Sequence, residues 1–575
     1  MKVKLARTAG FCMGVRRAMN IVLDAANKKE GKLYTYGPLV HNPQAIEMLR
    51  QKGVEVLDHE TVSDATVIIR AHGVPPDERK RIKETGNLIC DATCPHVAKA
   101  HSIIKKGINK GYNAIIIGDK GHAEVNGLLG FAGDKGYVVE NTDDVDKLPD
   151  LENAYVVAQT TQDRKTYEEI IDKIKEKVPD TEIFDTICDS TNMRQKEAIE
   201  LAEEVDAMVV IGGKNSANTK RLYEISLSTG TPSFHIETED ELDNIGLEQY
   251  ENIGVMAGAS TPNWVIKKAI DRIKYLQKKS KSRLYRFFES IGNFIVDSSL
   301  YLALGAVSMC YTSLVFQDIM PSAMILLVAF LYVFTVHVFN RYTERLNDEL
   351  FDPSRTRFFK IFGKPLIITA TIASIISMFL SYELGIIPFA LLLFSYLMGI
   401  LYSIRIVPVK LQSFIKYKRL RDVPGSKDIF IAVAWAWVIV LIPALKEEIH
   451  FTYQSIVILG FVSLTVFIRS VIFDIMSIED DRIVGRETIP IIIGPKKTQA
   501  TLLFIAIVIG IFMFSSSATG LVPTLGYFLI IPPVLMVVCL YVFQKRKFQA
   551  SSLFEAIVDT NFILTGVIAY LWHMT

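Results

Sequence analysis

The chain has 575 residues, of which 22% are charged and 50% hydrophobic, and its formal net charge is +1. At roughly 100–200 residues per domain this length predicts several domains, and the hydrophobic fraction is high for a wholly soluble protein. The near-neutral charge, without a basic tract interleaved with aromatic residues, argues against a nucleic-acid partner. The opening residues MKVKLARTAGFC contain no apolar run of signal-peptide length, so we expect this end to stay in the cytoplasm. Six cysteines in a reducing compartment are more typical of free, metal-binding or catalytic thiols than of disulfides.

The hydropathy pattern of the chain changes near its middle. Residues 1 to about 270 alternate β-branched runs such as ATVIIR and DAMVVIGG with charged helical stretches, which predicts α/β units with parallel sheets. From about residue 285 come nine apolar stretches, each near the ~20 residues that a helix needs to cross a bilayer. We expect these transmembrane helices at 295–315, 321–340, 364–381, 385–404, 428–445, 453–473, 500–518, 521–542 and 554–573. The predicted organisation is a soluble α/β domain at 1–275, a basic juxtamembrane linker at 276–290 and an all-α polytopic membrane domain of about nine helices at 291–575.

The loops between these stretches predict an orientation, because cytoplasmic loops carry an excess of Lys and Arg. The loops after the second, fourth, sixth and eighth stretches are basic or very polar, whereas the alternate loops, such as FQDIM and SSATG, are short and poor in basic residues. We therefore expect the soluble half on the cytoplasmic side of the membrane and the C-terminus on the other side.

A threefold repeat runs through the soluble half. In each copy a cysteine closes a short segment and opens a helix, a polar residue follows four positions after a glycine, and another polar residue ends a β-like run. The steps from the cysteine to the first polar residue are 29, 28 and 28. The members are Cys12, His41 and His72 in one copy, Cys94, His122 and Thr160 in the second, and Cys188, Ser216 and Ser260 in the third.

This repeat predicts a cofactor site where the three copies meet. Three thiolates suit an iron-sulfur cluster, which normally takes four cysteines, so one iron would stay open to substrate. His and Ser side chains together with helix N-termini form a ring of donors suited to an anionic diphosphate. Glu124, two residues after His122, is the one acid in these motifs and could relay protons.

Other readings of the cysteines compete with a cluster. A single buried Cys is more often a small hydrophobic residue than a ligand, but three at equivalent points of a repeat favour ligation. Structural zinc is disfavoured because the thiols are dispersed singly, without a C-x-x-C pair. Cys90 lies four residues before Cys94 and has no counterpart in the other copies, so we expect it to be a buried strand residue.

The motifs of this half resemble those of the 4-hydroxy-3-methylbut-2-enyl diphosphate reductases, the IspH or LytB family. The resemblance spans about residues 1–270 and is carried by AGFCMGVRRA, GPLVHN, RAHGV, DATCPHV, GHAEVNG, QTT, the ICDST…RQ run, GGKNSANTKRL and AGASTPNW. It implies a trefoil of three α/β lobes around a 4Fe-4S cluster held by Cys12, Cys94 and Cys188. It also implies that Glu124 delivers protons, that Thr160 orients the substrate hydroxyl, and that the diphosphate is held by His41, His72, His122, Ser216, Asn218 and Ser260.

The reaction implied by this resemblance is a two-electron reductive dehydroxylation that yields isopentenyl and dimethylallyl diphosphate. Reduced ferredoxin or flavodoxin is the implied electron donor. The family commonly has two adjacent serines where this chain reads Ser216-Ala217, which removes one expected hydrogen bond to the diphosphate.

Carboxylates at the ends of membrane spans mark functional candidates in the second half. Asn340, Glu344 and Asp348 are four residues apart on one helix face, and a second acidic cluster contains Asp474, Asp480 and Asp481. Both clusters fall on the predicted cytoplasmic side, where facing carboxylates could hold Mg²⁺ and a diphosphate. Charged residues of a solvated loop are the competing explanation.

These segments resemble the UbiA family of membrane prenyltransferases over about residues 285–575. By that resemblance Mg²⁺ and diphosphate would be bound by Asn340, Glu344, Asp348, Lys427, Asp474 and Asp481. The pattern departs from the family at two places, because Glu344 replaces the middle acid of N-x-x-x-D-x-x-x-D and Ser477 replaces the second acid of D-x-x-D-x-x-x-D. Glu344 can still bind Mg²⁺, whereas the serine removes one carboxylate and is expected to weaken one metal site.

The sequence thus predicts a fusion of a diphosphate reductase with a prenyltransferase-like domain that acts on a lipophilic prenyl acceptor. We expect a multi-pass protein of the bacterial inner membrane. Two alternatives remain open: an inactive membrane anchor in the second half, and a membrane-tethered iron-sulfur electron carrier in the first. Passage of product between the halves is a further hypothesis, and a shared pathway is better supported.

Overall fold

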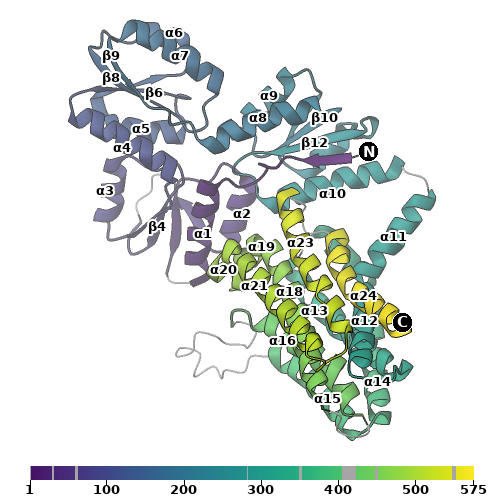
Figure 1. The fold of residues 1–575 in the computed structure, drawn as a ribbon. Helices are drawn as coiled ribbons and strands as arrows, with labels where there is room; N and C mark the ends of the chain where they lie inside the picture. The colour runs from purple at the N-terminus through teal and green to yellow at the C-terminus, as the bar shows by residue number, and fades with distance from the viewer. Residues whose placement is uncertain are drawn as a thin grey trace. The chain divides into compact units, whose positions relative to one another are not determined.

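The structure is a computed structural model that describes residues 2–28, 31–57, 62–280, 283–348, 352–403, 423–446, 451–546 and 552–575. It divides into two compact units, Met1–Ser280 and Lys281–Thr575. Figure 1 shows strands and helices in the first unit, coloured purple to teal, and helices throughout the second, coloured teal to yellow. The change in hydropathy pattern near residue 285 therefore corresponds to a change in architecture.

Unit 1 contains three sheets of four parallel strands each. Their orders are β3-β2-β4-β5, β7-β6-β8-β9 and β1-β12-β10-β11. The strands are β1 (Lys2–Leu5), β2 (Leu33–Tyr36), β3 (Val54–Leu57), β4 (Thr66–Ile69), β5 (Leu88–Asp91), β6 (Asn113–Ile117), β7 (Gly136–Val139), β8 (Asn153–Ala158), β9 (Asp180–Ile183), β10 (Ala207–Ile211), β11 (Ser233–Ile236) and β12 (Asn252–Ala257). The predicted α/β units with parallel sheets are confirmed.

Helices connect the strands, as parallel pairing requires. They are α1 (Met13–Lys28), α2 (Pro43–Gln51), α3 (Pro76–Glu84), α4 (Pro95–Asn109), α5 (Ala123–Ala132), α6 (Thr142–Asp146), α7 (Arg164–Lys177), α8 (Asp189–Glu203), α9 (Ala217–Ser228) and α10 (Asn263–Ser280). The central strands β6, β8, β10 and β12 are almost entirely buried, because helices cover them and their residues are mainly Ile, Val and Ala.

The strands of the third sheet follow a different order along the chain from those of the other two sheets. Strand β1 comes first in the sequence but pairs with β12, where it takes the edge place that β5 and β9 hold in the other two sheets. Each of these edge strands leads into one of the three repeat cysteines: β1 into Cys12, β5 into Cys94 and β9 into Cys188. Cys90 lies in β5 beside Ile68 of β4 and is half-buried, so its predicted place in a strand is confirmed.

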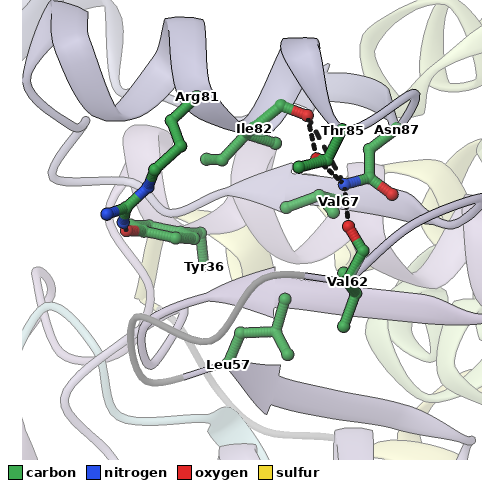
Figure 2. A pocket seen from close by; sticks show the side chains of 8 residues that line it. All are labelled: Tyr36, Leu57, Val62, Val67, Arg81, Ile82, Thr85 and Asn87. Atoms are coloured by element: carbon green, nitrogen blue, oxygen red, sulfur yellow. Dashed lines mark hydrogen bonds between the residues drawn. The ribbon is translucent and has the colours of Figure 1, made fainter.

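The first lobe contains a small enclosed cavity beneath α3, shown in Figure 2. Arg81 donates to the Tyr36 hydroxyl at 2.7 Å, and the Asn87 amide donates to the Val62 carbonyl at 2.6 Å and to the Thr85 hydroxyl at 2.7 Å. The cavity measures about 10 Å³, which is room for one water at most. It is too small to hold a substrate.

Unit 2 consists of helices. They are α11 (Arg283–Asp297), α12 (Leu300–Phe316), α13 (Ala323–Asp348), α14 (Pro353–Glu383), α15 (Ile386–Ser403), α16 (Ser426–Ala436), α17 (Ile442–Ala444), α18 (Tyr453–Met476), α19 (Ile478–Val484), α20 (Ile489–Ile493), α21 (Pro495–Ala518), α22 (Leu525–Phe528), α23 (Ile531–Arg546) and α24 (Ser552–Met574). A π-helical turn at Trp437–Leu441 joins α16 to α17.

The predicted count of nine membrane spans is not confirmed. Among the described residues seven helices are long and apolar enough to cross a membrane, or eight if the bent pair α11–α12 forms one span. The stretch expected at 385–404 is a helix whose apolar part, Ile386–Ile400, is shorter than a span. The stretch expected at 295–315 is divided, because α11 and α12 meet at 61°. Several predicted cytoplasmic loops, including 404–422 and 547–550, lie outside the described residues.

Candidate active site

The three repeat cysteines occupy equivalent places in unit 1. Each directly precedes a helix, namely α1, α4 or α8. The backbone N–H of each donates to a carbonyl two residues beyond the end of a central strand. These bonds run from Cys12 to Ala259 (3.1 Å), from Cys94 to Ala71 (2.9 Å) and from Cys188 to Thr160 (3.0 Å). The sequence repeat is thus a structural repeat that positions the thiols.

The thiols also lie close to one another. All three are free and half-buried. A Cβ placed on Gly14 would lie 2.4 Å from Cys94 Sγ and 4.0 Å from Cys12 Sγ, so only glycine leaves room for both sulfurs. Burial raises the pKa of Cys94 and Cys188, and negative charge on Cys12 raises both further. Free, neighbouring thiols fit the ligand set of an iron-sulfur cluster.

Arg194 is a buried cation beside this cysteine site. It stands six residues after Cys188, where the other two repeats have the buried residues Ala18 and Ala100. Its guanidinium donates to the carbonyl of Gly10 at 2.7 Å and to that of Ala257 at 3.1 Å. Arg194 therefore ties the segment that leads to Cys12 to the end of strand β12.

Three histidines form a second cluster, the histidine ring, made of His41, His72 and His122. Their ring centroids are 4.7, 5.5 and 5.5 Å apart, and one nitrogen from each lies within 4.8 Å of the others. Burial lowers the pKa of all three, that of His122 to about 4. The imidazoles are therefore neutral at pH 7 when no anion is present.

The hydrogen bonds of the histidine ring favour an anion over a metal ion. His122 Nδ1 accepts from the Glu124 backbone N–H at 3.2 Å, so in the neutral ring the proton is on Nε2. His41 Nε2 and His72 Nδ1 are buried and have no hydrogen-bond partner within the described residues. Buried polar atoms without partners are costly, and a bound anion would satisfy those that carry a proton.

The structure corrects the register of the repeat at two positions. The helix N-caps are Asn42, His122 and Ser216, so Asn42 and not His41 is the counterpart of the other two. The N-cap lies six positions after the end of β2 but five after the end of β6 or β10, and this one extra loop residue places the His41 imidazole in the ring. The counterpart of His72 and Ser260 is Thr161, because each lies three residues beyond the end of its central strand.

Thr160 has a different role, which is to hold the one buried acid of the motifs. Its backbone N–H donates to Glu124 Oε1 at 2.7 Å and its hydroxyl donates to Oε2 at 2.9 Å. Glu124 is 1% exposed, and burial raises its pKa to about 7 even though these hydrogen bonds act in the opposite direction. A carboxyl group with this pKa can give up a proton near neutral pH.

The remaining predicted ligands come from the third lobe. Ser216 Oγ accepts from the Thr219 backbone N–H at 3.3 Å, which leaves its own proton available. Asn218 Nδ2 is buried and has no hydrogen-bond partner within the described residues. Ser260 donates to the His41 carbonyl at 3.2 Å and so joins the third lobe to the first. Ala217 begins α9, so the missing second serine would have stood at the first helical position.

A groove of about 740 Å³ opens beside this site within unit 1. It is lined by α2, by β3 and by Gly213 and Asn215 of the third lobe, and His41 and Asn42 form part of its wall. A Cβ at Gly213 would lie 2.7 Å from the His41 carbonyl oxygen, so glycine permits this close approach of the two lobes. The groove thus brings the first lobe's ligands within reach of solvent.

In unit 2, three carboxylates lie near Lys427, namely those of Asp428, Asp474 and Asp481. Lys427 Nζ lies 3.3 Å from Asp474 Oδ1, and Asp474 is 1% exposed. Asp428, which the sequence reading missed, is fully buried beside Asp474 and accepts from Ser470 at 2.5 Å. Its place directly after Lys427 in the RDVPGSKD segment could have identified it.

The other predicted site residues of unit 2 differ in their burial and in their contacts. Asp481 is buried and accepts from the Ser477 hydroxyl at 2.8 Å, so the serine that replaces a family acid supports its neighbour. Asp480 is half-buried and Asn340 is exposed. The side chains of Glu344 and Asp348 lie outside the described residues, so the facing of the two clusters stays a prediction.

Comparison with known proteins assigns each half separately. Residues 3–274 match the LytB protein family and residues 299–559 match the UbiA prenyltransferase family. A 4-hydroxy-3-methylbut-2-enyl diphosphate reductase of Geobacter sulfurreducens is 43% identical over 282 residues, which are 49% of this chain and 100% of that protein. The protein of the same name from Aquifex aeolicus is 39% identical over 274 residues, 47% of this chain and 95% of that protein.

Solved structures resemble each half as well. A structure of (E)-4-hydroxy-3-methyl-but-2-enyl diphosphate reductase shares 39% identity and covers 48% of this chain and 100% of its own, with a TM-score of 0.40. A UbiA homologue from Archaeoglobus fulgidus bound to DMAPP and Mg²⁺ shares 12% identity and covers 48% of this chain and 97% of its own, with a TM-score of 0.35. The curated relatives are matched over nearly their whole length, so the chain belongs to the LytB family and carries a UbiA prenyltransferase-family domain in its second half.

Proposed function

We propose that unit 1 is a 4-hydroxy-3-methylbut-2-enyl diphosphate reductase. The observation that carries this proposal is the placement of three equivalent thiols, a buried acid held by Thr160, and a ring of uncharged imidazoles within one three-lobed domain of the LytB family. A 4Fe-4S cluster on Cys12, Cys94 and Cys188 would supply the two electrons and an open iron for the allylic hydroxyl.

The diphosphate would be recognised by groups that lack partners in the absence of substrate. The Asn218 amide is a buried donor, and His122 carries its proton on Nε2. The helices α2, α5 and α9 add three N-termini whose dipoles favour negative charge. Because an adjacent anion raises the pKa of an imidazole, the ring can take up protons as the diphosphate binds.

The protons would come from Glu124 by way of Thr160. Glu124 Oε1 accepts from a backbone N–H, which can only donate, whereas the partner of Oε2 is a hydroxyl that can reverse its role. A proton on Oε2 can thus be donated to Thr160 Oγ1, which in turn donates to the substrate oxygen. Thr160 would thus position the acid and also orient the substrate hydroxyl.

The overall reaction balances as follows. The carbon–oxygen bond to the allylic hydroxyl breaks, two electrons enter the allyl fragment, one proton leaves with the hydroxyl as water and a second is added to carbon. Protonation at either end of the allyl fragment gives isopentenyl or dimethylallyl diphosphate. The electrons would be supplied by reduced ferredoxin or flavodoxin.

A substitution at Glu124 tests this proposal in the full chain. After anaerobic reconstitution and chemical reduction, the wild-type protein should convert the hydroxylated diphosphate to the two five-carbon products. Glu124→Gln should lose about 10²-fold or more of this activity while it retains its iron, because the amide cannot supply a proton. Equal product formation by both proteins would exclude Glu124 as the acid.

For unit 2 we propose a Mg²⁺-dependent prenyltransferase that acts on a lipophilic acceptor. Asp474, Asp481 and the partner cluster Asn340, Glu344 and Asp348 would hold Mg²⁺ and, with Lys427, the prenyl diphosphate. The close pair Lys427–Asp474 and the buried Asp428 beside it support a built polar site over solvated loop charges. Asp428 joins this set as a carboxylate that neutralises part of the metal charge.

Labelled prenyl transfer in membranes tests the second activity. Mg²⁺ should be required, and Asp474→Asn should remove transfer while the reductase activity in the same membranes persists. No transfer by the wild-type protein to any lipid-extract acceptor would favour an inactive anchor, for which Ser477 in place of an acid is the specific indication.

The same proposal includes a location. We place the protein in the bacterial inner membrane as a multi-pass protein, with the reductase on the cytoplasmic side. The basic loops between alternate apolar stretches support this orientation.

A further inference from the structure

Helix α11 presents an apolar stripe that the described protein does not cover. Leu284, Phe287, Phe288 and Ile291 recur at the spacing of one helix face, and they are 68%, 58%, 64% and 40% exposed. Glu289 and Asn293 fall on the opposite face by the same periodicity. Four large apolar side chains this exposed in water would be an aggregation hazard.

The apolar stripe continues at its C-terminal end into packed protein. Phe294 lies two turns beyond Phe287 and one turn beyond Ile291, and its ring is 5.7 Å from that of Phe358 and 5.4 Å from that of Phe362 in α14. The exposed part of the stripe is therefore an extension of a face that unit 2 already buries.

A bend that is held by buried hydrogen bonds, here called the elbow, separates α11 from α12. The two helices meet at 61°, and Ser298 and Ser299 between them are fully buried, with Ser299 at a φ of +68°. Arg341 Nη1 donates to the carbonyls of Val296 and Asp297, both at 2.9 Å, and its Nη2 is paired with Glu555 at 2.7 Å. Because buried bonds from α13 and α24 hold the bend, α11 does not continue α12 as a straight span.

The angle of the elbow inclines α11 toward the membrane plane. Membrane helices tilt by about 20° from the bilayer normal on average, so a bend of 61° from such a span would leave α11 at roughly 40–80° from that normal. With 15 residues it is about 22 Å long. The segment 276–290, which includes the first half of α11, has five basic residues and one acidic residue, a balance suited to lipid phosphates.

We propose that α11 is an interfacial helix that lies in the boundary between headgroups and acyl chains of the bilayer that α12 enters, with Leu284, Phe287, Phe288 and Ile291 inserted among the lipids. Amphipathic helices with large apolar and aromatic residues on one face and polar residues on the other bind membranes in this way. The helix is an anchor at the junction between the soluble unit and the membrane unit.

Bromolipid quenching in the full chain tests this placement. The protein is reconstituted in nanodiscs whose lipids carry bromine at a shallow or at a deep acyl position. Tryptophan is introduced on the apolar stripe by Phe288→Trp and on the opposite face by Asn293→Trp, and the emission of the parent protein with its four native Trp is subtracted. Shallow bromine should quench the Phe288→Trp signal at least about threefold more than the Asn293→Trp signal.

Two further variants separate a flat helix from an upright one. Leu284→Trp and Ile291→Trp lie two turns apart on the stripe, so a helix in the membrane plane gives them the same shallow depth. Quenching that shifts from shallow to deep bromine between these two positions would show an upright extension of the span and overturn the proposal. Equal, weak quenching at 284, 288 and 291 would also overturn it, because the stripe would then be covered by protein or water.

Discussion

At the scale of single residues, the account depends on which thiols and which acid occupy special surroundings. Cys94 has equivalents at Cys12 and Cys188, and each of the three backbones is bound to the end of a central strand. Cys90, four residues earlier, is half-buried in β5 and takes no part in this pattern. The two neighbouring cysteines should therefore differ sharply on substitution.

Cys94→Ser should lose most of the bound iron and the reductase activity, because an iron-sulfur cluster needs thiolate ligands. Cys90→Ser, its matched control, should keep both near the wild-type level. Iron analysis and visible absorption of the two anaerobically purified variants make the comparison. Equal loss in both variants would mean that Cys90 is also a ligand and that the threefold reading is wrong.

The pH dependence of the reaction should report Glu124. Burial raises its pKa to about 7, so the carboxyl group is protonated below that pH and loses its proton above it. As a proton donor it acts only in the protonated form, so kcat/KM should fall by about tenfold per pH unit above about pH 7. A kcat/KM that stays constant between pH 6 and pH 9 would assign the proton donor to another group.

At the scale of elements, the repeat shows what the sequence could and could not predict. The spacing of the cysteines and the alternation of apolar and helical runs predict three α/β lobes, and the parallel sheets confirm them. The spacing did not predict that Asn42 is the N-cap of α2 and so the counterpart of His122 and Ser216. The extra residue in the loop before α2 cannot be recognised from the sequence, because only the position of the helix start shows it. The ICDST…RQ run includes Arg194, but its role could not be predicted, since it depends on Gly10 and Ala257, which are distant in sequence.

The start of α1 offers a direct test of the cysteine site. In Gly14→Ala the new methyl group would lie only 2.4 Å from Cys94 Sγ, so either the sulfur or the helix backbone must move. We expect a marked loss of bound iron and an overpacking cost of about 1–3 kcal/mol. Gly127→Ala in α5 is the control, because its Cβ would meet only ordinary contacts from 3.4 Å outward. Full iron content in Gly14→Ala would contradict the geometry proposed for the thiols.

At the scale of the whole molecule, the sequence predicts the two halves well and the membrane half in less detail. Composition alone separates the α/β unit from the helical unit near residue 280. Hydropathy could not distinguish a straight span from the α11–α12 elbow, because the buried Arg341 bonds that make the bend come from other helices.

The two units should respond separately to damage in the membrane half. Arg469 and Asp559 form a buried pair between α18 and α24, with Nε–Oδ1 at 2.6 Å and Nη2–Oδ2 at 3.2 Å. Asp559→Ala leaves Arg469 buried and unpaired, which should cost about 3–5 kcal/mol. Thermal unfolding in detergent should show a lowered transition for unit 2, while the reductase activity measured below that transition is unchanged. A lost reductase activity at low temperature would mean that unit 1 depends on unit 2.

Replacement of both partners distinguishes an unpaired charge from a packing defect. Arg469→Met combined with Asp559→Leu removes both charges, and such replacements are often close to neutral in stability. The double variant should therefore recover most of the stability that Asp559→Ala loses. No recovery would attribute the loss to packing of α24 instead of to the unpaired Arg469.

The first half is proposed to be a reductase whose cluster carries three protein thiolates and acts on substrate directly. The direct measurement is anaerobic purification of residues 1–280, a length that the curated relatives span as whole proteins, followed by iron analysis and turnover with the hydroxylated diphosphate. The account predicts about four irons per chain and both five-carbon diphosphates, with two electrons consumed per product. A protein without a cluster, or one whose reduced cluster gives no product, would contradict it.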